Sequence, residues 1–168
     1  MREISPLELD FNVFNTVGKE WMLITAGDEK GFNTMTASWG HMGCIWGSNA
    51  PTTVVYIRPQ RYTKEFVDRE AYYTLTVFPE DYRKALNYLG TKSGREGDMV
   101  AAAGLTPVHE EDYTYFKEAA LVLVCRTLYQ APLKEEYFRD AAVMEKNYPN
   151  KDFHDLYIGH IEKVLVSE

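Results

Sequence analysis

Short runs of β-branched and aromatic residues, separated by turns that contain Gly or Pro, recur along the chain and limit its fold most strongly. Such side chains fit the half-buried surface of a sheet, so each run predicts a strand. Strands outnumber helices, and the two do not alternate as they would in a parallel sheet. We therefore expect a mainly β fold, a β-barrel of antiparallel strands with flanking helices. The predicted strands are 21–26, 32–39, 52–57, 71–78, 118–128 and 156–166.

The segments between these runs contain the turn and helix signals. Residues 27–31 predict a turn that joins the first two strands in a hairpin. Gly40, Gly43 and Gly47 predict a loop or a short helical turn rather than a further strand. Helices are expected over 64–67 with Thr63 as N-cap, over 79–89 with Gly90 as the stop, and over 98–103, while 133–143 is ambiguous.

Length and charge limit the class of protein. The 168 residues are expected to form one domain, 1–168, since a chain of this size buries roughly 70% of its unfolded surface. The chain has 18 basic and 25 acidic residues, which gives a formal charge of −7. This balance argues against nucleic acid or an anionic membrane as the main partner.

Cysteine spacing and the N-terminus favour the cytoplasm. Cys44 and Cys125 are the only cysteines, and they show neither a zinc pattern nor a disulfide framework. The histidines lack metal-binding spacing too, so no metal site is expected. Residues 1–6 contain no apolar signal core, and the longest apolar run, 119–125, is too short for a bilayer.

A cationic cluster follows the third predicted strand. Arg58, Arg61 and Lys64 lie within one short window of an acidic chain, beside the hydroxyls of Tyr62 and Thr63. Guanidinium groups and hydroxyls at a strand-to-helix junction suit a phosphate. A solvated edge with ordinary salt bridges is the alternative that these residues alone leave open.

The strand before that cluster is slender and polar on one face. Thr34, Thr36 and Ser38 occupy alternate positions, and the segment from Thr36 through Ala37 and Ser38 to Trp39 covers about 10 Å at strand rise. That length matches a fused tricyclic ring, and small side chains would let the ring edge reach backbone N–H groups. A strand beside an anion clamp suggests a flat, phosphorylated cofactor. An edge strand with nothing bound is the alternative.

These segments resemble the flavin reductase-like family of FMN-binding split barrels, including its flavoredoxin-type members. The resemblance is carried by 33–39, by Trp46-Gly47 and by 57–63, and it continues through 92–95, Cys125-Arg126, His154 and 157–159. It implies an antiparallel split barrel, a homodimer and FMN at the subunit interface. The ring is then expected against Thr36, Ala37, Ser38 and Trp39, and the phosphate on Arg58, Arg61, Tyr62 and Thr63.

The resemblance also implies roles for residues outside the two segments. Trp46, like Trp39, is a candidate to flank the ring. Lys92, Ser93, Gly94 and Arg95 resemble a second polar loop near the cofactor, although Asp98-Met99 stands where relatives often have Asp-Lys. His154 resembles a histidine near the flavin or the hydride donor and is the candidate catalytic residue.

The function expected from this resemblance is an FMN-dependent oxidoreductase. FMN would pass electrons between a reduced donor, either NADH or NADPH or a protein, and a small-molecule or protein acceptor. No Gly-x-Gly-x-x-Gly is present, so a nicotinamide dinucleotide would not be held on a Rossmann turn. A non-enzymatic flavin-binding electron carrier, a split barrel for haem or another planar ligand, and an unliganded interaction domain are the alternatives.

Overall fold

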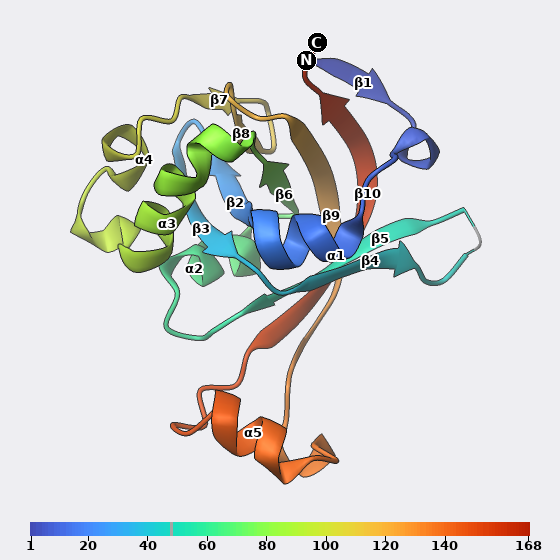
Figure 1. Cartoon of the computed structure of the whole chain (residues 1–168), viewed down its shortest axis with the longest axis vertical. Helices are drawn as coiled ribbons and strands as arrows, with labels where there is room; N and C mark the ends of the chain where they lie inside the picture. The colour runs from blue at the N-terminus through green and yellow to red at the C-terminus, as the bar shows by residue number, and fades with distance from the viewer. Residues whose placement is uncertain (48) are drawn as a thin grey trace.

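The computed structural model describes residues 1–47 and 49–168. Its main element is an eight-stranded antiparallel sheet that curves around a central core, with helices on its outer side (Figure 1). The mainly β, antiparallel fold is thus confirmed. Along the sheet the order is β3-β2-β6-β9-β10-β5-β4, and β1 pairs with β10. The strands are β1 Arg2–Ile4, β2 Met22–Asp28, β3 Gly31–Ala37, β4 Gly40–Cys44, β5 Pro51–Ile57, β6 Tyr72–Val77, β9 Leu121–Pro132 and β10 Asp155–Val166.

The helices are short, and most of them lie close to the sheet (Figure 1). They are α1 Val13–Asn15, which continues as a π-helical segment Thr16–Glu20, α2 Tyr62–Arg69, α3 Arg83–Thr91, α4 Met99–Ala102 and α5 Ala141–Asn147. Turns of 3-10 helix occur at Pro6–Glu8, Glu80–Tyr82, Gly94–Glu96 and Glu135–Tyr137. A separate hairpin, β7 Pro107–His109 with β8 Thr114–Phe116, closes one end.

Aromatic and aliphatic side chains fill the inside of the curved sheet. Tyr73 and Tyr157 are fully buried there, together with Leu75, Val55 and Leu123. A second apolar cluster lies outside the sheet, where Leu86 and Leu89 of α3 pack with Leu23, Phe78 and Phe116. The helical spacing of Leu86 and Leu89 therefore marked the buried face of α3, as the sequence predicted.

The sheet is split between β3 and β4. These two strands follow each other in the chain but lie at opposite ends of the strand order, and they do not pair within the described residues. Only Ser38 and Trp39 connect them. The outer backbone edge of β3 is consequently left without a neighbouring strand.

The prediction of a loop or helical turn over Gly40 and Gly43 is wrong. Residues Gly40–Cys44 form β4 and pair with β5, with Gly40 opposite Val55 and Cys44 opposite Pro51. A Cβ at Gly40 would lie 3.1 Å from Met22 Cε and 3.2 Å from the Val54 carbonyl oxygen, so little room exists for a larger residue. Pairing with β5 outweighs the weak strand preference of glycine here.

The start of α2 also differs from the prediction. The helix begins at Tyr62 with Arg61 as N-cap, because Arg61 N–H closes a turn onto the Arg58 carbonyl at 3.0 Å. The prediction of Thr63 as N-cap is therefore wrong. Instead, the buried Thr63 hydroxyl accepts a hydrogen bond from Asn33 Nδ2 at 2.7 Å.

Residues 133–154 form an excursion between β9 and β10 that stands away from the sheet (Figure 1). It contains α5, and its aromatic residues Phe138, Tyr148 and Phe153 pack on one another. The excursion returns to the sheet at His154, whose carbonyl accepts from Leu133 N–H at 2.8 Å. It thereby brings Tyr148 and His154 beside the end of β5.

No helix among the described residues combines the length and the apolar character needed to cross a bilayer.

Candidate functional site

Two adjoining hollows form one groove where β3, the end of β5 and the start of α2 meet. Met35, Arg58 and Arg61 line both hollows. The first, the strand hollow, has a volume of about 220 Å³ and is lined by Thr36, Ala37, Ser38, Trp39, Tyr56 and His154 in addition. The second, the helix hollow, has a volume of about 260 Å³ and includes Asn33, Gln60, Tyr62, Thr63, Lys92, Ser93 and Gly94. The groove therefore gathers most of the predicted site residues.

The strand hollow lies along the segment that leaves β3. Thr36 donates its hydroxyl to the Leu86 carbonyl at 2.5 Å, and Thr34 is buried with its hydroxyl 3.2 Å from the Ile24 carbonyl. The hydroxyls of Thr34 and Thr36 are therefore already hydrogen-bonded to backbone carbonyls within the protein. What β3 offers a ligand is its unpaired backbone edge, together with the exposed Ser38 and Trp39.

The helix hollow lies at the N-terminus of α2, where an anion is favoured. The Arg61 side chain gives no N-cap hydrogen bond, and the N–H groups of Tyr62 and Thr63 cannot have intrahelical partners. Arg61 reaches the Gly90 carbonyl at 3.4 Å and makes no salt bridge within the described part of the chain. A guanidinium and free helix N–H groups together form a site for a phosphate or carboxylate.

Arg58 lines the groove, but its hydrogen bonds go to residues of the excursion. Its Nη1 lies 2.5 Å from Asp152 Oδ2, and its Nη2 donates to the Asn147 carbonyl at 2.9 Å. Gln60 and Arg58 both donate to the Asp152 carboxylate and hold its pKa below the usual value. Part of the Arg58 charge is therefore balanced within the chain, and Arg61 is the stronger candidate for an anion.

Lys64 does not join the anion site. Its Nζ lies 2.7 Å from Asp68 Oδ2 and 2.8 Å from Asp155 Oδ2, and it does not line the groove. These contacts attach α2 to the first residue of β10. The cationic cluster of the sequence thus divides into an Arg61 that lines the groove, a partly neutralised Arg58 and a structural Lys64.

His154 lies at the end of the strand hollow as a buried, neutral imidazole. Its ring contacts Trp39 at a centroid distance of 5.1 Å, and its Nδ1 lies 2.8 Å from the Tyr148 hydroxyl. Burial, and then the positive charges of Arg58 and Arg61, lower its pKa to about 4. At neutral pH His154 can therefore offer a hydrogen bond but not a positive charge.

We expect His154 to make stability depend on pH. Its folded pKa of about 4 lies below its ordinary value of 6.5, so the unfolded chain binds the proton first. This contribution is complete above pH ~6.5 and is lost as the pH falls towards 4. In His154→Asn, the decrease in urea midpoint between pH 7.5 and pH 5 should be smaller than in the wild type. An equal decrease in both proteins would contradict the buried, neutral state.

The predicted second polar loop divides between two environments. Lys92, Ser93 and Gly94 line the helix hollow. Arg95 does not: its guanidinium forms a salt bridge with Glu65 and lies over the Tyr62 ring, 4.5 Å from the centroid. Within one chain the Arg95 guanidinium is thus directed to Glu65 and the Tyr62 face, and its predicted cofactor contact stays a prediction.

Trp46 is not brought to the groove within one chain. It lies at the turn between β4 and β5, is 64% exposed, and lines neither hollow. Arg58 follows the opposite end of β5, which at strand rise is about 20 Å away. The structure of one chain therefore leaves the predicted contact of Trp46 with a cofactor as a prediction.

Sequence reasoning missed several residues of the site. Asn33 lines the helix hollow, bonds Thr63 and lies against Gly94, and its place at the head of the polar strand was the available signal. Tyr56 lines the strand hollow, and Tyr148 and Asp152 contact His154 and Arg58. Tyr148 and Asp152 follow the ambiguous segment 133–143, in a part of the sequence where no pattern indicated a role.

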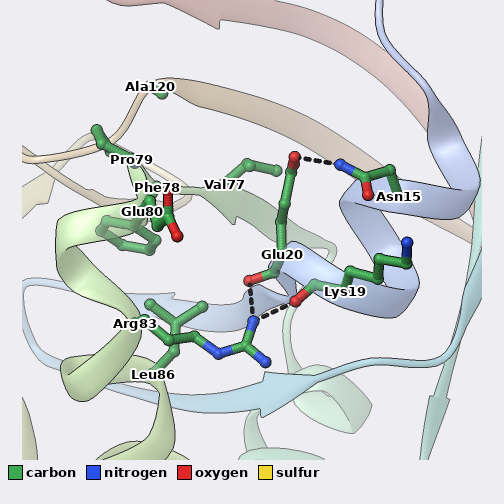
Figure 2. Close-up of a pocket in the computed structure, with 10 residues that line it drawn as sticks. All are labelled: Asn15, Lys19, Glu20, Val77, Phe78, Pro79, Glu80, Arg83, Leu86 and Ala120. Carbon is green, nitrogen blue, oxygen red and sulfur yellow. Dashed lines mark hydrogen bonds between the residues drawn. The ribbon is translucent and has the colours of Figure 1, made fainter.

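Figure 2 shows a separate hollow of about 590 Å³ between the helical segment after α1 and the start of α3. Arg83 Nη1 donates to the carbonyls of Lys19 and Glu20, and the Glu20 carboxylate accepts from Asn15 Nδ2 at 2.5 Å (Figure 2). None of the predicted site residues lines this hollow. Two of the charged side chains that line it, Glu20 and Arg83, are thus hydrogen-bonded within the protein.

The comparison with protein families decides the assignment. Residues 14–168 match the model of the flavin reductase like domain. The chain belongs to the flavin reductase-like family. The predicted family resemblance is thereby confirmed. A comparison with curated proteins gives no match.

Solved structures of this family share the fold. The flavoredoxin of Desulfovibrio vulgaris (Miyazaki F) is 24% identical with a TM-score of 0.68, over 88% of this chain and 69% of that one. An FMN-binding protein from Thermus thermophilus with bound p-hydroxybenzaldehyde is 18% identical with a TM-score of 0.68, over 100% and 83%. Nitrilotriacetate monooxygenase component B from Bacillus cereus is 19% identical with a TM-score of 0.68, over 100% and 82%. These flavin reductase-like structures support the split-barrel architecture.

Proposed function

We propose that this flavin reductase-like protein is an FMN-dependent oxidoreductase that passes electrons between a reduced donor and an acceptor. The observation that carries the proposal is the groove itself, which has an uncapped helix N-terminus with Arg61 at one end and the unpaired edge of β3 at the other. A phosphorylated ligand with a flat ring requires these two environments in this order.

The phosphate of FMN fits the helix hollow by charge and by donors. Arg61 and the N–H groups of Tyr62 and Thr63 would hold it, and Lys92 and Ser93 line the same hollow. In a chain with a formal charge of −7, a guanidinium that forms no salt bridge among the described residues favours an anion there, and Glu96 is the acidic residue that shares the hollow.

The isoalloxazine ring fits the strand hollow. The backbone of Thr36, Ala37 and Ser38 would give hydrogen bonds to its polar edge, while Trp39 and His154 would flank it. When bound, FMN supplies the redox chemistry, and the protein supplies anchoring, orientation and electrostatics. The neutral His154 would orient a ligand by a hydrogen bond rather than act as a cationic acid.

The proposed assembly is a homodimer. The turn between β4 and β5 ends in exposed apolar side chains, Ile45 at 39% and Trp46 at 64%, which a second copy would cover. Contact across such an interface would also bring Trp46 near a cofactor. The free thiols of Cys44 and Cys125 support a reducing, cytoplasmic location.

Spectroscopy of FMN-loaded protein tests the proposal. We expect FMN to co-elute with the protein in gel filtration, with its fluorescence changed by the binding site. NADH and NADPH are then added separately under anaerobic conditions, and flavin absorbance near 450 nm, about the usual flavin maximum, is followed. Bleaching by either would indicate a nicotinamide donor, while bleaching only by a reduced protein would indicate an electron carrier. Failure to retain FMN would contradict the proposal.

A further inference from the structure

The hydroxyl of Tyr148 has one hydrogen-bond partner among the described residues, the Nδ1 of His154 at 2.8 Å. Both side chains are buried. Tyr148 directly follows α5 and lines neither hollow of the groove, whereas His154 lines the strand hollow. The hydrogen bond therefore joins a residue outside the groove to one inside it.

The Tyr148 ring is held from several sides. Its backbone N–H donates to the Met144 carbonyl at 2.8 Å. Its ring centroid lies 4.9 Å from that of Phe153, and the Arg58 guanidinium carbon lies 5.1 Å from it on another side. A hydroxyl on a ring so constrained can meet His154 in only one way.

The proton of this hydrogen bond can lie on either partner. If the Tyr148 O–H donates to Nδ1, the neutral imidazole carries its own proton on Nε2. If Nδ1–H donates instead, the buried O–H has no acceptor among the described residues. Burial raises the Tyr148 pKa, so the phenol keeps its proton at neutral pH. Because an unpaired buried donor costs free energy, the first arrangement should be favoured by about tenfold or more.

The Nε2 atom of His154 is left for a ligand. It has no hydrogen-bond partner within the described part of the chain, and it is not among the unpaired side-chain atoms that are sealed from solvent. Trp39, which also lines the strand hollow, lies beside the imidazole with the ring centroids 5.1 Å apart. A hydrogen on Nε2 would therefore make His154 a neutral donor at the place expected for the flavin ring.

We propose that Tyr148 is a positioning residue, which holds His154 in the Nε2–H tautomer and so provides a hydrogen-bond donor to the flavin ring. This inference rests on the proposed function, since it places the ring in the strand hollow. A reduced flavin carries more negative charge on its ring heteroatoms than an oxidised one, so a donor beside the ring favours the reduced form. Tyr148 would thus influence the reduction potential of the cofactor without touching it.

Nitrogen-15 NMR of apoprotein with labelled histidine, near neutral pH, tests the tautomer without FMN. The His154 signals are those that disappear in His154→Asn. In the wild type, Nε2 should show the shift of a nitrogen that carries hydrogen, and Nδ1 that of an acceptor. Tyr148→Phe keeps the ring and removes the hydroxyl, so both signals should move towards the average of the two tautomers. A wild-type proton on Nδ1, or unchanged signals in Tyr148→Phe, would overturn the inference.

Tyr56→Phe is the matched control for the NMR measurement. The Tyr56 ring also lies near His154, with the centroids 6.4 Å apart, but its hydroxyl lies 3.2 Å from His41 Nδ1. Loss of this hydroxyl should move the signals of His41 and leave those of His154 in place. Equal effects of the two variants on His154 would indicate altered packing and would also refute the role of Tyr148.

Redox titration of FMN-loaded protein tests the consequence for the cofactor. Tyr148→Phe should weaken the binding of reduced FMN relative to oxidised FMN by up to about tenfold, which for a two-electron couple lowers the potential by about 30 mV. In a His154→Phe background the same change should have no further effect, because Tyr148 acts through His154. If His154→Phe does not fold, His154→Leu replaces it.

The outcomes separate this inference from the proposed function. FMN-loaded Tyr148→Phe with the wild-type potential overturns the inference alone, as does an equal shift of the potential in the background that lacks His154. Failure of the wild type to retain FMN contradicts the proposed function, and the tautomer of His154 in the apoprotein is still decided by NMR.

Discussion

Replacement of Arg61 by alanine is expected to weaken FMN binding by about tenfold to a hundredfold, since a charge-assisted hydrogen bond contributes about 1.5–3 kcal/mol. Arg61 is the residue at which the position, the charge and the lack of an acidic partner coincide. It is the N-cap of α2 and lines both hollows of the groove. Among the described residues its side chain bonds only the Gly90 carbonyl, at 3.4 Å.

Titration of apoprotein with FMN, followed by flavin fluorescence, measures this effect. Arg69→Ala is the matched control, because Arg69 lies at the other end of α2, pairs with Glu70 and packs over Phe66. The control removes the same charge from the same helix and should retain wild-type affinity. Equal affinities for FMN in Arg61→Ala and the wild type would refute the assignment of the helix hollow to the phosphate.

Gly159→Ala should lower the free energy of unfolding by about 3 kcal/mol, the upper range for overpacking in a core. A Cβ at Gly159 would lie 2.3 Å from the Tyr73 hydroxyl oxygen and 2.7 Å from Cζ. Tyr73 cannot move away easily, since it is fully buried and its hydroxyl lies 2.7 Å from Thr53 Oγ1. The close approach occurs inside the sheet, where Gly159 lies between Thr53 of β5 and Thr127 of β9.

Urea unfolding at neutral pH measures the loss, and Gly43→Ala supplies the comparison. Gly43 lies on β4, and a Cβ there meets no atom within 4 Å. This second variant should change stability by less than about 0.5 kcal/mol. Similar losses in both variants would indicate that glycine freedom, and not the contact with Tyr73, determines the effect.

The strands whose side chains form the core were predictable, because these side chains are apolar or aromatic and favour buried positions in a sheet. The runs of Val, Ile, Leu and Tyr in β5, β6, β9 and β10 are long enough to indicate strands without any tertiary information. β4 was missed, since its glycines give no such signal and its pairing depends on the edge that β5 presents. The strand preference of the local sequence is enough to predict β5, β6, β9 and β10, whereas β4 forms because it pairs with β5.

The sequence indicated the groove where basic residues occur in a chain that is acidic overall. Arg61 attracted notice as a cation in an acidic chain, and the structure leaves it without an acidic partner in the described residues. Lys64 had the same signal but pairs with Asp68 and Asp155. Asp68 lies four residues further along α2, so the sequence contained that pair, whereas the contact with Asp155 depends on how β10 returns to α2. Tyr148 reaches His154 only because the excursion folds back, and no spacing in the sequence encodes that contact.

The gap between β3 and β4 has a mechanical consequence. Because the described residues form no ladder bonds across it, its width can change without breaking a backbone hydrogen bond, and the short link through Ser38 and Trp39 absorbs the change. A continuous barrel would have to give up paired backbone groups for the same adjustment. The gap between β3 and β4 can thus adjust to planar ligands of different width at little cost in free energy.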